Sequence, residues 1–592
     1  MKTTLRLNIP RQRFETLSFC GATPEAMHEW VANLPVTNVI ATAMRLYEGI
    51  MELNQLQCHP EHRFLMLEEL RGAIHSQCRS LSLTFLRGPL VLSGHAQQLA
   101  DLVQALQNQL AMGYKVVVAD GVQARIRFGL DPRPHPHTMA SALHRAISDL
   151  TRSILCSCQL YTHPPSEIWL ELHQLYRFAE IKEMLEEEVA DPENELMELT
   201  TIGNAYLRAA LLGCVEANTM RRDDLTHLFH ALEIWASHAC FGPVDDEALF
   251  LVDLSADAPP VYGALNEAKR HDACRSLDTR ALVDSLNHHL GEVDTPIPVP
   301  DSISPEVVRH AVHSWGGLAR RIFTRAPANG ELHVCVGISA THYHIAGEMD
   351  FADLLGEDAA DALNPFLRYA DEHPLTREDR DIWDKAFDAS RTRMSRNPNV
   401  EDNERQPPSA NDTELDPSNA HPSFATEMVD ASPGGYCIRW RDEVPANLQT
   451  GELLAVREET DAEWAVAVVR WVRNVKNEGT LMGIELLAPR ALAVGARVIR
   501  KKGGATDYLR ALLLPELRAI RQPARVITPK LPFQSRQKIQ INQAGQVLTA
   551  QLGESTGSTE GFSQFEFRLL EGAPQALEED AQNYRGLSIY GR

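Results

Sequence analysis

The run Asp430-Ala431-Ser432-Pro433-Gly434-Gly435-Tyr436-Cys437-Ile438-Arg439-Trp440 decides how the C-terminal half of the chain folds. Pro433 fixes φ at the first central position of a turn, and Gly434 accepts the positive φ that a type II turn needs next. From Tyr436 onward, large side chains alternate with Cys437 and Arg439, which is the period-two pattern of a half-buried strand. The run therefore predicts a turn followed by a strand. The chain is mainly helical in pattern before it and mainly strand in pattern after it.

Further strand-like segments follow the turn. Glycine and charged residues interrupt them about every ten residues, the spacing of a small antiparallel barrel. We assign to this barrel residues 452–456, 464–472, 481–487 and 496–500. A second set of strands is expected at residues 508–514, 525–528, 538–542, 547–552 and 562–569. The pattern predicts a β-barrel over 424–502, a second β-rich domain over 503–575 and a tail over 576–592.

The N-terminal part has mainly the three- and four-residue apolar spacing of amphipathic helices. Four helices are expected at 139–160, 166–188, 195–218 and 222–241, and another from Ser93 to Met112 with Gly113 as its stop. Strands are expected at Lys115–Asp120 and at Glu331–Ser339, the latter in a hairpin with Thr341–Ala346. The predicted fold class is multidomain α+β. The predicted N-terminal divisions are a mixed α/β domain 1–137, a helical bundle or short solenoid 138–245, an α+β domain 246–370 and an acidic flexible linker 371–423.

The charge of the chain limits its partners. The 592 residues carry a formal net charge of −23, which argues against a general binder of nucleic acid or of anionic membranes, because phosphate contacts need clustered cations. No run approaches the roughly 18 apolar residues of a membrane span, and no apolar run follows the cations of residues 1–10, so no signal peptide is expected. We expect a cytoplasmic protein that is not inserted in a membrane.

Metal sites and enzyme signatures are not evident in the sequence. The ten cysteines are scattered, and reduced, mostly buried thiols account for them. His342 and His344 would point to the same face of a strand, with His333 nearby, and we interpret all three as histidines on a mixed polar face. A metal site would need a third ligand and an acidic second shell, which the spacing does not specify. The phosphate-loop, nucleophile-elbow, zinc-protease and dinucleotide motifs are all absent. We therefore expect no cofactor, no metal and no enzyme, although a catalytic site of scattered residues within 1–350 stays open.

The barrel resembles a PilZ domain. Asp430, Ser432 and Gly435 fit that family's Asp/Asn-x-Ser-x-x-Gly pattern without substitution. The order of the following strands fits as well, with Gly451-Glu452, Val468–Trp471 and Gly483–Glu485 at successive strands. The resemblance covers residues of about 424–502 and leaves the remainder of the chain unassigned.

The resemblance implies cyclic di-GMP as the ligand. The acidic and hydroxyl side chains of the motif bind guanine edges in that family, and the last glycine allows close approach of the backbone. An Arg-x-x-x-Arg element just upstream of the motif usually binds the phosphates and the second guanine, because guanidinium groups bind phosphate bidentately and stack on bases. In the acidic segment upstream, Arg391, Arg393 and Arg396 are the candidates, although their spacings are two, three and five. Arg321 and Arg325 have the spacing of four but lie in a different predicted domain.

The function that follows is a bacterial cytoplasmic signalling adaptor. The PilZ-like domain senses cyclic di-GMP, and the N-terminal part passes the signal to protein partners. The predicted ligand-binding residues are Asp430, Ser432, Gly435, Arg391, Arg393 and Arg396. Three alternatives stay open: the motif is an Asx-type turn that only stabilises a hairpin, the protein is a nucleotide-independent scaffold that uses its Tyr436/Trp440 face, or an enzyme site lies within 1–350.

Overall fold

The structure is a computed structural model, which describes residues 7–571 apart from internal gaps. The gaps are residues 36, 124–133, 245–248, 264–270, 292, 294–295, 318–325, 357–420, 442–443, 459–461, 476–477, 501–502, 517–521, 544 and 560. The chain divides into two compact units. Unit 1 comprises residues 1–322 and 473–478, and unit 2 comprises residues 323–472 and 479–592.

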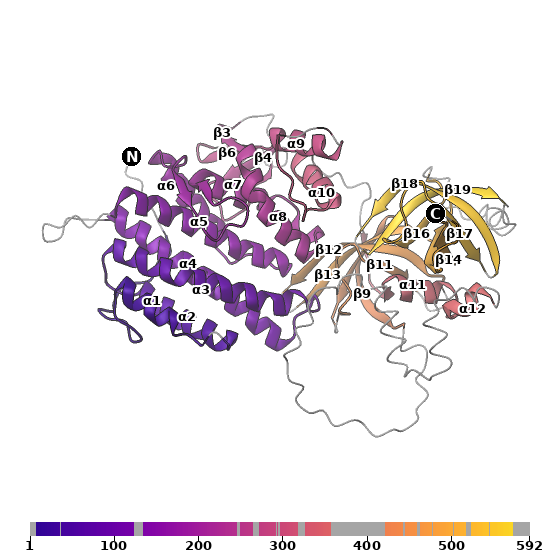
Figure 1. The fold of residues 1–592 in the computed structure, drawn as a ribbon, viewed down its shortest axis with the longest axis horizontal. Coiled ribbons are helices and arrows are strands. Elements are labelled where there is room, and N and C mark those ends of the chain that lie inside the picture. Colours follow the sequence, from indigo (N-terminus) through magenta and orange to yellow (C-terminus); the bar gives the residue numbers. More distant parts are fainter. Residues whose placement is uncertain are drawn as a thin grey trace, which may run out of the picture. The chain divides into compact units, whose positions relative to one another are not determined.

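Unit 1 is built mainly of helices, and α3, α4 and α5 lie side by side (Figure 1). The helices are α1 (Pro24–Ala32), α2 (Val39–Asn54), α3 (Pro60–Leu86), α4 (Gly94–Gln123), α5 (Pro136–Gln159), α6 (Ile168–Ile181), α7 (Ile202–Gly213), α8 (Arg222–Trp235), α9 (Arg280–Leu290) and α10 (Pro305–Gly316). Two 3₁₀ turns, Ala217–Thr219 and Ala236–His238, flank α8. Two small sheets complete the unit.

Capping side chains begin several of these helices. Thr23, Asn38 and Thr201 each accept a hydrogen bond from a backbone N–H in the first turn of the helix that follows. Ser93 does the same for α4, which confirms the predicted start of that helix. Among the described residues no helix has the length and apolarity that crossing a membrane requires.

The strand predicted at Lys115–Asp120 is wrong, because these residues belong to α4. Gly113 does not end the helix. It allows α4 to approach its neighbours closely, since a Cβ there would lie 2.5 Å from Leu67 Cδ2. Val116, Val117 and Val118 are fully buried, so packing in the bundle outweighs the preference of β-branched residues for strands.

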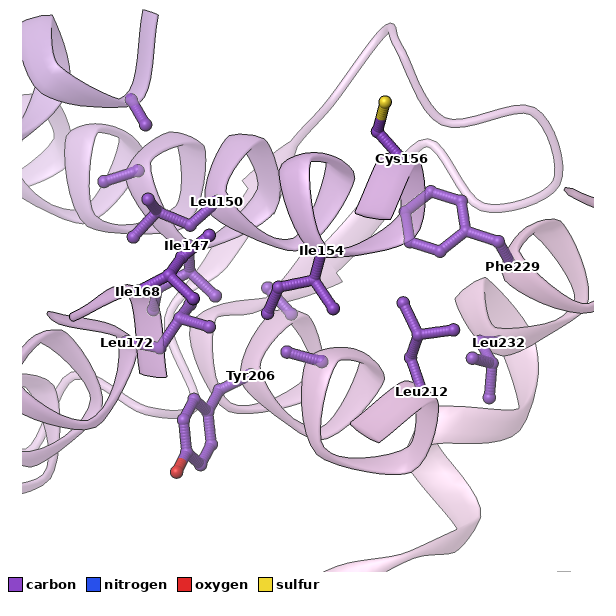
Figure 2. Packing of buried hydrophobic residues seen from close by; sticks show 14 of the residues in the cluster. Ile147, Leu150, Ile154, Cys156, Ile168, Leu172, Tyr206, Leu212, Phe229 and Leu232 are labelled. Atoms are coloured by element: carbon purple, nitrogen blue, oxygen red, sulfur yellow. The ribbon is translucent and has the colours of Figure 1, made fainter. Parts of the chain in front are cut away.

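The four helices predicted over 139–241 are present as α5 to α8. The helices α6, α7 and α8 are shorter than predicted, whereas α5 begins earlier, at Pro136. A two-stranded sheet that the sequence did not predict, β1 (Glu188–Ala190) with β2 (Leu199–Thr201), lies between α6 and α7. Figure 2 shows side chains of α5, including Ile147 and Ile154, packed with those of α6, α7 and α8. Each fully buried side chain of this kind contributes about 2 kcal/mol relative to its exposure to water.

The second small sheet of unit 1 has the order β3-β6-β4-β5, with its strands antiparallel. Its strands are β3 (Cys240–Gly242), β4 (Phe250–Asp253), β5 (Val261–Tyr262) and β6 (Cys274–Asp278). Phe250 and Val252 of β4 join the core of the unit.

Unit 2 contains two closed barrels. In the first, β10 pairs with β13 on one side and with β9 on the other, which closes the ring β8-β9-β10-β13-β12-β11. A short strand, β7, adds to the outer edge of β9. The strands are β7 (Ala326–Pro327), β8 (Glu331–Val336), β9 (Ser423–Ser432), β10 (Gly435–Trp440), β11 (Leu453–Arg457), β12 (Ala465–Val475) and β13 (Gly479–Ala488).

The first barrel begins earlier in the chain than the sequence predicted. The strand β8 was assigned to a separate α+β domain, but it pairs with both β11 and β9 and is part of the ring. Residues 337–422 are therefore inserted between two neighbouring strands of one barrel. The predicted acidic linker 371–423 lies almost wholly in this insertion, and most of it is outside the described residues.

The predicted partner strand at Thr341–Ala346 is wrong. These residues form most of α11 (Ile338–Ile345), which is followed by α12 (Phe351–Leu355). His342 and His344 consequently lie on a helix rather than on one face of a strand. His342 Nε2 donates to the carbonyl oxygen of Val494 at 3.2 Å, and His344 Nε2 donates to that of His421 at 2.8 Å.

The second barrel confirms the predicted second β-rich domain and contains one strand more than expected. Its ring is β14-β15-β16-β19-β18-β17. The segment 496–500 was assigned to the first barrel, but β14 pairs with β15 and β17 and belongs to the second. The strands are β14 (Leu492–Val498), β15 (Leu509–Leu514), β16 (Arg525–Pro529), β17 (Lys538–Gln543), β18 (Gln546–Ser558) and β19 (Phe562–Glu571).

The two barrels share a hydrophobic cluster within unit 2. It includes Leu453 and Val466 of the first barrel, Leu512 and Ile527 of the second, and Ile338 of α11. At α12, the carbonyl oxygen of Leu355 accepts a hydrogen bond from Asn542 Nδ2 at 3.0 Å. The helices α11 and α12 therefore join the barrels into one packed body.

His342 makes the stability of this body depend on pH. Burial, with a smaller effect from Arg510, lowers the pKa of His342 to about 3, while an unfolded histidine has a pKa of about 6.5. The unfolded chain therefore binds more protons below pH 6.5, and the folded state loses about 2 kcal/mol from this group at pH 5. We expect hydrogen exchange of the β14 amides to show easier opening at pH 5 than at pH 7.5.

His342→Gln is the matched variant, because its side-chain amide can donate to Val494 but does not titrate. This variant should show a smaller difference in the opening free energy of β14 between the two pH values. Equal pH dependence in wild type and His342→Gln contradicts the assignment to His342.

Candidate functional site

The predicted turn is the connection of the β9–β10 hairpin. Ser432 pairs with Gly435, so Pro433 and Gly434 form a two-residue loop. The Ser432 hydroxyl donates to the carbonyl oxygen of Gly435 at 3.2 Å. A turn with a strand after it is confirmed. The positive φ predicted for Gly434 is wrong, because the glycine of this hairpin with a positive φ, 149°, is Gly435.

Gly435 is required by the barrel itself. A Cβ on this residue would lie 1.9 Å from the carbonyl oxygen of Ile484 and 3.0 Å from Cα of Glu485. Both neighbours are backbone atoms of β13, which cannot move aside without opening the ring. The structure thus shows a close approach of one strand to another at this glycine.

Asp430 lies beside an irregularity in the hairpin. The register changes from Cys437 opposite Asp430 to Ile438 opposite Met428, so Val429 has no partner on β10. A β-bulge of this kind bends the strand and redirects the neighbouring side chains. Asp430 and Ser432 are both half-buried, which leaves their polar groups within reach of solvent.

The strand β7 lies against the other edge of the motif. Ala326 pairs with Ala431, and Pro327 pairs with Asp430. The backbone N–H of Ala328 also donates to the carbonyl oxygen of Val429 at 3.2 Å. Residues immediately upstream of the first barrel thus lie next to the Asp430–Ser432 segment, a proximity that the order of the sequence does not reveal.

The structure does not describe the arginines that the sequence suggested for this site. Arg391, Arg393 and Arg396 lie outside the described residues, as do Arg321 and Arg325. In the sequence, Arg321 and Arg325 precede β7, which pairs with the strand that carries Asp430.

Two other arginines near the motif are already paired. Glu427 lies 2.7 Å from the Arg441 guanidinium and 3.5 Å from that of Arg439. These ion pairs are on the surface and contribute little stability, but each guanidinium already has a carboxylate beside it. Arg439 and Arg441 are therefore poorly suited to hold a second anion.

The Tyr436/Trp440 face is not a single exposed surface. Tyr436 is half-buried, and its hydroxyl donates to Glu458 at 2.8 Å. Trp440 is buried and packs against Phe424 with ring centroids 5.4 Å apart. The alternation of large side chains over 436–440 indicated one half-buried face, but Tyr436 and Trp440 differ in their burial.

A closed six-stranded barrel whose hairpin carries Asp-x-Ser-x-x-Gly defines the chain as a protein with a PilZ domain. Three family models match consecutive segments of the chain. They are described as the N-terminal domain of the cyclic-di-GMP receptor FimW, residues 25–244, its middle PilZ domain, residues 249–492, and the FimW C-terminal β-barrel domain, residues 494–570.

A curated relative matches almost the whole chain. It is the cyclic-di-GMP receptor FimW of Pseudomonas aeruginosa, 36% identical over 586 residues, which are 96% of this chain and 94% of the relative. The chain belongs to the FimW family. This result confirms the resemblance to PilZ proteins, and the relative is named as a receptor, in line with the expectation that the chain is not an enzyme. No solved structure matches the chain.

Proposed function

We propose that the protein is a receptor for cyclic di-GMP, with its site at the β9–β10 hairpin and the segment that leads into β7. Asp430 and Ser432 bind the guanine edges in this proposal, and Arg321 and Arg325 bind phosphate and stack on a base. Gly435 shapes the hairpin and does not contact the ligand. The name of the FimW relative as a cyclic-di-GMP receptor supports the choice of ligand.

The pairing of β7 with β9 is the observation that carries this proposal. Ala326 pairs with Ala431, between the two polar residues of the motif. Arg325 is covalently bonded to Ala326, and consecutive Cα atoms are about 3.8 Å apart. In the sequence, Arg321 precedes Arg325 by four positions, which is the Arg-x-x-x-Arg spacing of the family.

The hairpin motif and the two arginines of the proposed site would bind different parts of the ligand. A carboxylate accepts hydrogen bonds from the N–H groups of guanine, whereas a hydroxyl can both donate and accept. Guanidinium groups bind phosphate oxygens bidentately and stack on aromatic rings. The acidic balance of the whole chain makes such a local pair of cations necessary for a dianionic ligand.

Signal output by protein contacts is the second part of the proposal. Unit 1 holds more than half of the chain, and its surface is available to partners of a cytoplasmic signalling adaptor. The scaffold and enzyme alternatives are weaker. The scaffold alternative relied on the Tyr436/Trp440 face, of which Trp440 is buried, and the enzyme alternative is not supported by the FimW relative, which is named as a receptor.

Calorimetric titration of the full chain with cyclic di-GMP tests the site. Arg325→Ala, Arg321→Ala and Asp430→Ala should each weaken binding by about thirtyfold or more, because each removes one partner of a charged hydrogen bond. The triple variant Arg391→Ala/Arg393→Ala/Arg396→Ala should bind like wild type. Arg441→Ala, whose guanidinium is paired with Glu427, is the matched single-arginine control.

Two results would overturn the assignment. Loss of binding in the triple variant with retention in Arg321→Ala and Arg325→Ala places the phosphate-binding arginines in the acidic insertion. Absence of binding heat in the folded wild-type chain removes the receptor proposal and favours the nucleotide-independent scaffold.

A further inference from the structure

The β1–β2 hairpin exposes apolar side chains on a loop that buried side chains hold in place. We call residues 191–199, the connection from β1 to β2 together with the first residue of β2, the hairpin loop. Leu196, Met197 and Leu199 are 42%, 41% and 48% exposed. Three large apolar side chains within four residues are unusual for a surface, where single exposed apolar residues are the norm.

Two buried carboxylates hold the hairpin loop, Asp191 at its start and Glu233 at its apolar part. At its start, Asp191 is completely buried, and its two oxygens accept hydrogen bonds from the Arg71 guanidinium at 2.6 and 3.0 Å. Arg145 lies 3.4 Å from the same carboxylate. Burial alone would raise the pKa of Asp191, but these guanidiniums outweigh it and hold the pKa well below its ordinary value.

The apolar part of the loop has its own anchor. Glu233 on α8 accepts hydrogen bonds from the backbone N–H of Leu196 at 2.7 Å and of Met197 at 3.2 Å. The other oxygen of Glu233 bonds to Arg208 at 3.0 Å. Two buried ion pairs thus fix the backbone from which the exposed side chains project, and a preorganised loop loses less entropy on binding.

Exposed acidic side chains are frequent in the hairpin loop and in the sequence beside it. Glu188 lies on the same outward face of the hairpin as Leu199, because Ala190 pairs with Leu199 and alternate residues share a face. Exposed glutamates continue along the neighbouring sequence at Glu183, Glu186, Glu187, Glu188, Glu195 and Glu198. Within the described residues only Glu195 of these forms an ion pair, with His230 at 3.1 Å.

We propose that the hairpin loop and its glutamates are a docking surface for a basic amphipathic segment of a partner protein. Apolar side chains of the partner pack on Leu196, Met197 and Leu199, and its lysines or arginines neutralise the surrounding carboxylates. The charge of the surface selects this class of partner over an acidic one. The proposal extends the adaptor function, but it does not depend on whether the receptor binds cyclic di-GMP.

The probe for this surface is a synthetic 18-residue Lys/Leu peptide designed as an amphipathic helix. A peptide with the same composition in scrambled order, without an apolar face, measures attraction by charge alone. Fluorescence anisotropy with the full chain should give at least tenfold tighter binding for the amphipathic peptide, and its binding should weaken as salt increases.

The variant Leu196→Ser/Met197→Ser/Leu199→Ser should lose about tenfold in affinity for the amphipathic peptide and little for the scrambled one. Leu83→Ser, at a leucine of α3 that is 54% exposed, is the matched control and should bind like wild type. All three substituted side chains are exposed, so the variant should keep the wild-type circular dichroism spectrum.

Three outcomes would overturn the proposal. Equal binding of the two peptides shows that only charge is recognised, and unchanged affinity in the triple variant shows that the peptide binds elsewhere. Self-association of the wild-type chain that the triple variant abolishes, measured by sedimentation without peptide, shows that a second copy of the chain occupies the surface.

Discussion

Gly435→Ala should open the first barrel at the junction of β10 and β13. The added Cβ would lie 1.9 Å from the carbonyl oxygen of Ile484, and the φ of 149° is strained for any residue with a Cβ. The strands must separate to admit it, which costs about 3 kcal/mol or more. Hydrogen exchange should show faster exchange of the β10 and β13 amides than in wild type.

Gly557→Ala is the control for this substitution. Gly557 also lies in a strand, and its nearest neighbour to an added Cβ is the Gln564 side chain at an ordinary 3.5 Å. That variant should retain the exchange rates of wild type in the first barrel. Unchanged β10 and β13 exchange in Gly435→Ala would show that the strands tolerate the extra carbon, and the glycine would then have to be explained by the ligand.

This prediction separates two reasons for the glycine of the motif. If Gly435→Ala weakens cyclic di-GMP binding together with barrel opening, the loss is explained by folding. Asp430→Ala makes no comparable steric conflict and should weaken binding while β10 and β13 remain protected. The pair of variants therefore distinguishes a damaged barrel from a damaged site.

The β-rich half of the fold could be predicted because its signals are local. Alternation of apolar residues and regular interruption by glycine identified most strands of both barrels. The assignment of strands to barrels could not be read from order alone. β8 is separated from β9 by 86 residues, which include the insertion, and only its pairing with β9 and β11 assigns it to the first ring.

Burial explains the main errors in the helical part. Val116–Val118 favour a strand by intrinsic preference, yet they lie fully buried in the middle of α4. Similarly, the segment 195–201 continues an apolar pattern typical of a helix, but Asp191 and Glu233 fix it as a loop that leads into β2. Neither contact is visible in the sequence, because the partners lie 120 and 36–37 residues away.

Half of the candidate site could be predicted, because only that half is local in the sequence. Asp430, Ser432 and Gly435 form a contiguous motif, whereas the arginines that we propose for the site, Arg321 and Arg325, are separated from it in the sequence by the insertion. The spacing of Arg321 and Arg325 was correct for the family, and the strand at Glu331–Val336 was also predicted. Had this strand been placed in the barrel, the arginines would have stood directly upstream of it.

Asp191→Ala should be among the most destabilising single substitutions in unit 1. It leaves Arg71 and Arg145 buried without the carboxylate that neutralises them, and removal of one partner from a buried ion pair costs about 3–5 kcal/mol. Asp149, 3.7 Å from Arg71, and Glu68, 3.2 Å from Arg145, compensate only partly. Hydrogen exchange should show easier opening of β1, β2 and the adjoining part of α5, together with a lower melting temperature of the full chain.

The pH dependence of this contribution has a defined sign. The folded pKa of Asp191 is lowered, so its stabilisation is present above the ordinary carboxyl pKa of about 4 and is lost as the pH falls below it. His144 lies beside Asp191, and burial lowers its pKa to about 3. Below about pH 6.5 the unfolded histidine binds a proton that the folded one does not, so His144 destabilises unit 1 from that pH downward. Unit 1 should therefore weaken from about pH 6.5 downward, and Asp191→Ala should remove only the most acidic part of that loss.

Glu195→Ala is the control for the charge at the hairpin loop, since Glu195 is exposed and its pair with His230 contributes little. It should leave the exchange of β1 and β2 unchanged.

Asp191→Ala should also lower the affinity of the chain for the amphipathic Lys/Leu peptide. Leu196, Met197 and Leu199 are intact in this variant, but the loop that carries them is no longer fixed. Wild-type peptide affinity in a folded Asp191→Ala protein would show that the buried ion pair stabilises the bundle without organising the docking surface.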